Sequence, residues 1–181
     1  MKKITVLILV VFLFCSIFAK EKDAGSVLHF DFVFSKPANT TSYLGTFGIS
    51  YGLDIKSVFE VKNLSLRPKA GISLGAGIVK EKIGLVNVES NCLYTLIIPD
   101  LSFYYYLREL KETTKEGILF YFGGGILMPI RIVSYSDDRF TDIFTNDFPF
   151  PTLKFGFILK EKYDFELNLS APSSLSFGFI F

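Results

Sequence analysis

The last seven residues, Leu175-Ser-Phe-Gly-Phe-Ile-Phe181, point most directly to the fold. Side chains alternate between the two faces of a strand. One face of this segment is therefore apolar throughout and carries Leu175, Phe177, Phe179 and Phe181. Chain ends usually fray in water, so a soluble domain rarely ends on such a strand. A strand that closes a barrel in a lipid bilayer has no free edge, and its apolar face meets hydrocarbon. The segment therefore predicts the closing strand of a membrane β-barrel.

The same alternation with period two recurs through the rest of the chain. Between positions 64 and 78 the even positions are almost all apolar, whereas the odd positions are Ser, Arg, Lys or Gly. Comparable segments lie at 28–34, 43–53, 101–108, 118–123, 154–160, 165–170 and 175–181. The pattern predicts an all-β fold, a single antiparallel up-and-down barrel of about eight strands. Ten strands are possible, since Ser57 to Val61 could pair as an additional strand.

Polar segments with turn residues separate the predicted strands. They lie at 35–42, 54–63, 80–91, 109–116, 134–149, 161–164 and 172–174. The sequence contains no internal repeat and no linker, so residues 20–181 are expected to form one barrel domain.

The N-terminus has the build of a secretory signal peptide. Lys2 and Lys3 precede an apolar stretch at 4–14, and a cleavage site is expected next to Ala19. The alternative is a lipoprotein signal processed at Cys15, although the bulky residues just before this cysteine fit that pattern poorly. Residues 1–19 are therefore expected to be removed and the chain to be exported.

Composition narrows the classes of function. Removal of residues 1–19 leaves 17 basic and 18 acidic residues, a balance that argues against nucleic acid as a partner. Of the two cysteines only Cys92 would remain, so no internal disulfide can form. With 21 Phe and 9 Tyr the chain carries a heavy aromatic load for its length.

The polar face of the strands is expected to line the barrel interior. The residues assigned to this lumen are His29, Asp31, Arg67, Lys69 and Arg108, together with Lys154 and Glu166. Opposite charges are expected to pair there, because an unpaired buried charge is costly. The tyrosines at 104–106 lie near a strand end, where an interfacial aromatic girdle is expected. Gly156→Ser is expected to be tolerated better than Phe157→Lys, since Phe157 would face lipid.

A terminal Phe preceded by apolar residues at alternate positions resembles the insertion signal of bacterial outer-membrane barrels. In general plan the chain resembles small eight-stranded barrels of the OmpA, OmpX and OmpW type. The resemblance implies an outer-membrane location, both chain ends on the periplasmic side, and a role in structure, surface contact or porin-like passage of small solutes. It also implies contact with outer-membrane lipid, assembly through the barrel-assembly machinery that recognises the C-terminal strand, and a monomeric state.

Little in the sequence indicates catalysis. His29 and Asp31 share a face and form a lumen hydrogen-bonding pair more readily than part of a catalytic triad. The chain is therefore expected not to be an enzyme and to need no cofactor or metal. Two alternatives stay open: a soluble periplasmic barrel that binds lipid or another apolar ligand, and a membrane-embedded lipid-modifying enzyme. A soluble barrel would turn its aromatic bands inward around a cavity, whereas a membrane barrel turns them outward.

Overall fold

The computed structural model describes residues 24–35, 44–83, 86–107, 117–136, 143–146 and 149–181. The expected signal peptide at 1–19, with its cleavage site and Cys15, lies outside these residues, and so does Arg108. Among the described residues, no helix is long and apolar enough to cross a bilayer.

Ten strand segments and one short 3₁₀ turn make up the described chain. The strands are β1 (Ala24–Ser35), β2 (Leu44–Lys56), β3 (Leu64–Ile83), β4 (Val86–Tyr106), β5 (Ile118–Leu127), β6 (Ile130–Tyr135), β7 (Ile143–Asn146), β8 (Phe150–Leu159), β9 (Tyr163–Asn168) and β10 (Ser173–Ile180). The 3₁₀ turn η1 (Val58–Glu60) joins β2 to β3.

These segments form a closed antiparallel barrel with eight strand positions. The hydrogen-bonded order runs β3-β2-β1-β10-β9-β8-β5-β4, and the pairing of β3 with β4 closes the ring. Segment β6 continues β5 along β4 in one unbroken register, because Leu127 pairs with Asp100 and Ile130 pairs with Ile97. Segment β7 pairs with β6 as β8 pairs with β5, so it extends the β8 position. The predicted all-β barrel of eight strands is confirmed.

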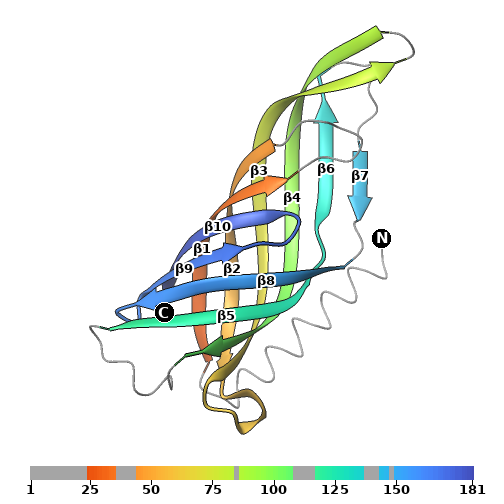
Figure 1. Cartoon of the computed structure of the whole chain (residues 1–181). Helices are drawn as coiled ribbons and strands as arrows, with labels where there is room; N and C mark the ends of the chain where they lie inside the picture. The colour runs from red at the N-terminus through yellow and green to blue at the C-terminus, as the bar shows by residue number, and fades with distance from the viewer. Residues whose placement is uncertain (1–23, 36–43, 84–85, 108–116, 137–142, 147–148) are drawn as a thin grey trace.

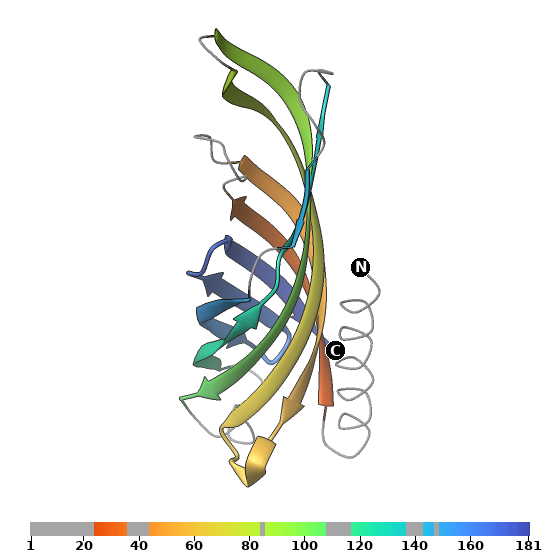
Figure 2. The same cartoon turned by 90° about the vertical axis from the view of Figure 1, so that its right-hand side faces the viewer.

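The barrel is taller on one side than on the other. Segments β3, β4, β6 and β7 continue past the ends of β1, β2, β9 and β10 as a curved sheet (Figures 1 and 2). On β3, pairing with β2 ends at Leu74, whereas pairing with β4 continues to Ile83. The prediction of a loop at 80–91 is therefore wrong, since all of this segment except 84–85 lies in the paired strands β3 and β4. Polar and charged side chains can also pair across neighbouring strands, so the polar composition of this segment does not prevent a ladder.

The connection between β2 and β3 is a tight turn. Residues Ser57, Phe59 and Glu60 adopt positive φ angles there, and Val61 N–H bonds to the Val58 carbonyl at 3.1 Å. A strand cannot run through three left-handed residues. The additional strand considered for Ser57 to Val61 is therefore absent.

The two faces of the wall carry opposite chemistry. Large apolar side chains with 37% to 75% of their surface exposed point outward from the barrel strands. Charged and hydroxyl side chains point inward, and most are less than 9% exposed. The barrel is thus inverted relative to a soluble protein, with its polar groups in the core.

Candidate functional site: a filled interior and an apolar outer wall

A network of buried charges fills the middle of the barrel. Residues two apart on a strand share a face, so β3 brings Arg67 and Lys69 inward and β9 brings Asp164 and Glu166. Lys154 enters from β8 and is completely buried. The carboxylates of Asp54 on β2 and Asp100 on β4 complete the set, and both are less than 9% exposed.

Arg67 pairs with one carboxylate on the neighbouring strand β2 and with another across the barrel on β9. Its Nη1 donates to Asp164 Oδ2 at 2.6 Å, and its Nε lies 3.5 Å from Asp54 Oδ1. Its Nη2 donates to the Tyr106 hydroxyl at 3.3 Å, while the guanidinium lies 4.4 Å from the centre of the Tyr104 ring. A planar guanidinium with several donors suits such a bridging position better than an ammonium group.

Glu166 is shared by both lysines of the network. Lys69 Nζ donates to Glu166 Oε1 at 2.8 Å, and Lys154 Nζ lies 3.7 Å from the same oxygen. Lys154 also forms an ion pair with Asp100 and donates to the Tyr104 hydroxyl at 2.9 Å. The network therefore links five strand positions, β2, β3, β4, β8 and β9, through paired charges, as burial of charge demands.

Tyrosines supply the remaining donors. Tyr104 donates to Glu166 Oε2 and Tyr121 donates to Asp164 Oδ1, each at 2.6 Å. Tyr104 and Tyr106 are completely buried, whereas Tyr105 between them is 40% exposed on the outer wall. The girdle expected at 104–106 is therefore wrong for two of its three residues. Their place on the polar face of the alternation was the signal that they point inward.

Two clusters of apolar and tyrosine side chains pack inside the barrel beside the charges. One cluster lies where β1 ends and the taller sheet begins, and contains Val33, Cys92, Tyr94, Leu96 and Val133. The other lies near the C-terminus and contains Tyr104, Tyr106, Leu119, Tyr121 and Ile158, with Ile180 packed against it. A cavity of about 20 Å³ beside Asp31 and Lys69 has room for about one water molecule.

The residues assigned to the lumen from the sequence lie as follows. His29, Arg67 and Lys69 are buried inside the barrel, and His29 Nε2 lies 3.2 Å from Asp164 Oδ2. Asp31 is partly buried and accepts a hydrogen bond from Ser176 Oγ at 2.5 Å. Arg108 lies outside the described residues. The expected His29 and Asp31 pair is not the contact that forms, because β9 supplies Asp164 across the lumen.

Three carboxylates of the network were missed in the sequence, namely Asp54, Asp100 and Asp164. Two of them were assigned to turns, since aspartate is common there. Asp164 lies two residues before Glu166 and shares its parity, which was the available signal. A polar residue beside a turn is assigned to its strand correctly only when the strand length is known.

The surroundings of Gly156 contradict the expectation that a serine would be tolerated at this position. A Cβ atom there would lie 2.4 Å from the Tyr121 hydroxyl and 2.2 Å from the Phe165 carbonyl oxygen. Tyr121 occupies the space that a side chain at position 156 would need, so Gly156→Ser is expected to disturb the barrel.

The C-terminal strand lies on the outer wall as its alternation predicts. Leu175 and Phe181 are 56% and 75% exposed, and Phe177 and Phe179 are partly exposed beside them. Phe181 exchanges two backbone hydrogen bonds with Ser26, at 2.9 and 3.1 Å, so the chain end is paired with β1. Whether these residues act as an insertion signal stays a prediction.

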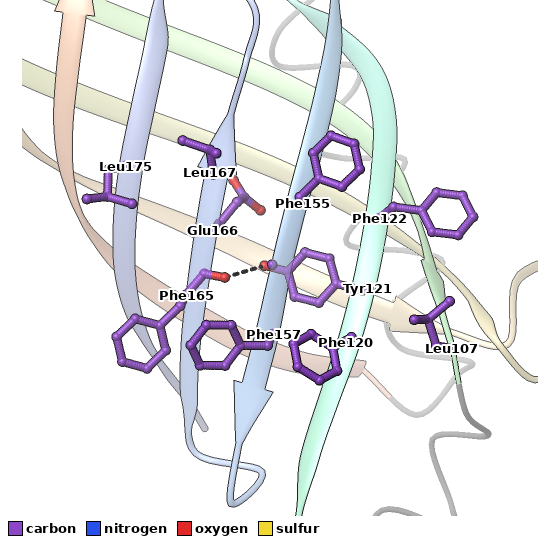
Figure 3. Close-up of a pocket in the computed structure, with 11 residues that line it drawn as sticks. Leu107, Phe120, Tyr121, Phe122, Phe155, Phe157, Phe165, Glu166, Leu167 and Leu175 are labelled. Carbon is purple, nitrogen blue, oxygen red and sulfur yellow. Dashed lines mark hydrogen bonds between the residues drawn. The ribbon is translucent and has the colours of Figure 1, made fainter.

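An apolar groove crosses the outer wall over β5, β8 and β9 (Figure 3). Its volume is about 540 Å³. It lies between two rows of side chains, and the lining consists of Leu107, Phe120, Tyr121, Phe122, Phe155, Gly156, Phe157, Phe165, Glu166, Leu167 and Leu175.

The barrel is similar to that of Neisserial surface protein A (NspA). The TM-score is 0.53 and the identity is 10%, over 87% of this chain and 95% of NspA. Ail, the attachment invasion locus protein of Yersinia pestis, solved in complex with the heparin analogue sucrose octasulfate, gives a TM-score of 0.44 and 7% identity over 88% of this chain and 99% of Ail. No protein-family model and no curated protein sequence matches this chain. The likeness to NspA confirms the resemblance to small outer-membrane barrels at the level of fold.

Proposed function

We propose that this chain is an integral outer-membrane protein whose sealed barrel anchors a raised β-sheet for contact at the cell surface. The single observation that carries this proposal is the inverted wall, with large apolar side chains outside and paired charges inside. In a bilayer the outer face meets hydrocarbon and the interior needs no contact with it.

The soluble alternative fits this arrangement poorly. A barrel that carries an apolar ligand turns its aromatic side chains inward. Here Phe30, Phe47 and Phe120 are each more than half exposed on the outside, and the space that a ligand would need is occupied by Arg67 and Lys154. Without a bilayer, the exposed apolar surface would cause aggregation.

The filled interior also argues against the passage of solutes. Arg67 reaches carboxylates on β2 and β9, and Lys154 reaches β4 and β9, so charged side chains cross the lumen. A pore through this region would have to break buried ion pairs. The barrel is therefore an anchor rather than a channel.

The raised sheet formed by β3, β4, β6 and β7 is the part of the protein that fits a contact role. It stands at the end of the barrel opposite the C-terminus, where Phe181 pairs with Ser26 of β1 (Figure 1). With the chain ends on the periplasmic side, this sheet lies on the outside of the cell. It exposes Ile78, Leu93 and Phe144, which are each more than half accessible.

Two measurements test the proposal. After expression with its signal sequence, the protein should sediment with outer membranes and resist extraction by carbonate or urea. In planar bilayers the purified barrel should give no stable single-channel conductance, whereas a general porin measured in parallel conducts. Recovery of the mature chain as a soluble monomer without detergent would refute the membrane location, and steady channels would refute the sealed barrel.

A further inference from the structure

We infer that the groove over β5, β8 and β9 holds one acyl chain of a phospholipid, so that the barrel carries a lipid on its wall at a defined place. This inference rests on the proposed membrane location and adds to it a binding site.

The shape of the groove is that of an extended chain. The strand register places Phe122 opposite Phe155, and Phe155 opposite Leu167, as one row across three strands. Two residues further along, Phe120, Phe157 and Phe165 form a second row in the same way. The two rows stand apart as the walls of the groove (Figure 3).

The second row forms a firm wall. The rings of Phe157 and Phe165 stack with their centroids 4.8 Å apart, and the centroids of Phe120 and Phe157 are 6.0 Å apart. Aromatic rings in such contact hold one another in place. The groove is therefore built into the wall and does not need to be opened by a ligand.

The floor of the groove carries no side chain that could recognise a polar ligand. Tyr121 and Glu166 line it, but both side chains point into the barrel, where Tyr121 donates to Asp164 and Glu166 accepts from Tyr104. Gly156 between them has no side chain. The walls of the groove are apolar and the polar side chains of its floor point away from it into the barrel, so the ligand that matches the groove is a hydrocarbon.

The size of the groove and its surroundings favour a lipid over a second protein. Eleven residues line it, fewer than the roughly 20–30 residues that each partner contributes to a stable protein interface. The groove is continuous with the outward apolar surface, to which Ile126 and Leu169 also belong. If the barrel lies in the outer membrane as proposed, lipid acyl chains cover that surface, and one of them can fill the groove.

The height of the groove along the barrel indicates which leaflet of the membrane it faces. The turn at 160–162 joins β8 to β9 at the end of the barrel where Phe181 lies. Phe157 lies three residues before this turn and Phe165 three residues after it. With that end on the periplasmic side, the groove faces the inner leaflet of the outer membrane, which consists of phospholipid. Lipopolysaccharide lies in the other leaflet.

Retention of lipid during purification tests the inference. The full chain is reconstituted with phosphatidylethanolamine, extracted into detergent and examined by native mass spectrometry. One phospholipid should remain on the wild-type barrel. Leu167→Trp, which fills the groove, should lower the lipid-bound fraction by about tenfold, because overpacking leaves no room for the chain. Leu101→Trp, a matched change on the outer wall away from the groove, should retain the lipid.

A fluorescence measurement locates the lipid. The chain has no Trp, so a single introduced Trp is an unambiguous reporter. With a brominated phosphatidylethanolamine, the retained lipid should quench Phe122→Trp in the groove and leave Phe30→Trp on β1 unquenched.

The possible results distinguish failure of the groove inference from failure of the membrane location. Three results for a barrel that folds in lipid would overturn the groove inference and leave the membrane location standing. The barrel retains no phospholipid, both Leu→Trp variants retain it equally, or the brominated lipid quenches the Trp on β1. A barrel that pairs through this face as a dimer also overturns it. Failure to enter lipid at all overturns both proposals.

Discussion

Glu166 is the residue on which the buried charges converge. It is 1% exposed, accepts from Lys69 and Tyr104, and lies 3.7 Å from Arg67 and Lys154. A carboxylate in this position balances several cations at once, so its loss leaves them without compensation. Buried polar networks of this kind stabilise a structure only while every member is satisfied.

Glu166→Gln should therefore destabilise the barrel strongly. The amide keeps the shape of the side chain and removes its charge, and the expected loss in free energy of unfolding is about 3 kcal/mol. Urea titration of the barrel refolded in detergent micelles measures it. Glu161→Gln, the same change at an exposed turn residue, is the control and should cost less than about 0.5 kcal/mol. Equal stability of the two variants would show that the buried pairs contribute nothing.

Gly156→Ala should also lower stability, although it adds only one methyl group. The new Cβ would lie 2.4 Å from the Tyr121 hydroxyl, and the expected cost is about 1–3 kcal/mol. Gly124→Ala is the matched control on β5, because the nearest atom to a Cβ there is the Thr152 carbonyl oxygen at 3.4 Å. The same urea titration compares them, and a Gly156→Ala variant as stable as the control would argue against the close approach of Tyr121.

At the scale of the element, each strand has a lipid-facing row and a lumen-facing row. Ile49 lies near the middle of β2 and is 51% exposed, whereas Ile118 begins β5 and is 48% exposed. Both point outward, so they differ chiefly in their depth along the barrel. The cost of a charge on a lipid-facing strand depends on this depth.

Ile49→Lys should accordingly cost about 2–4 kcal/mol in lipid vesicles, and Ile118→Lys about 0–1 kcal/mol, since lysine near an interface can reach water. Folding titrations in vesicles measure both. If the two variants lose equal stability, the outer face of β2 does not lie in hydrocarbon.

The C-terminal strand raises a prediction about assembly. Phe181→Ala keeps the backbone pairing with Ser26 and removes only the exposed ring. If the ring belongs to an insertion signal, the level of barrel in the outer membrane should fall several-fold, while the purified variant still refolds in detergent. Quantitative blotting of membrane fractions measures the level.

Phe59→Ala is the control for that experiment. Phe59 lies in the β2–β3 turn and is 73% exposed, close to the value for Phe181. It should assemble normally, because it lies outside the C-terminal strand. Normal assembly of both variants would remove the case for an insertion signal.

For the whole molecule, closure of the sheet is the decisive property. Every barrel strand in the described residues has neighbours on both sides for at least part of its length, so opening the ring requires several ladders to break together. Unheated and boiled samples should therefore migrate differently on a gel in mild detergent. Identical migration after verified refolding in lipid would contradict a stable closed barrel.

The strand face of nearly every residue follows from the sequence alone, because the alternation with period two is a local property of the backbone. It placed Phe30 outside and Arg67 inside, and it indicated eight strands and closure. Strand length was harder to predict, because the polar residues at 80–91 are compatible with a loop and with paired strands alike. Only the pairing of β3 with β4 in the structure decided between them.

Which groups meet was decided by the tertiary structure. His29 pairs with Asp164 rather than with Asp31, although 135 residues separate the two along the chain. Partners across a lumen depend on how far each strand is staggered when the ring closes, and that stagger is a property of the whole sheet. The groove between the two aromatic rows has the same origin, since it exists only where β5, β8 and β9 lie side by side. The sequence therefore determined the chemistry of each face, and closure of the barrel decided which residues of a face come into contact.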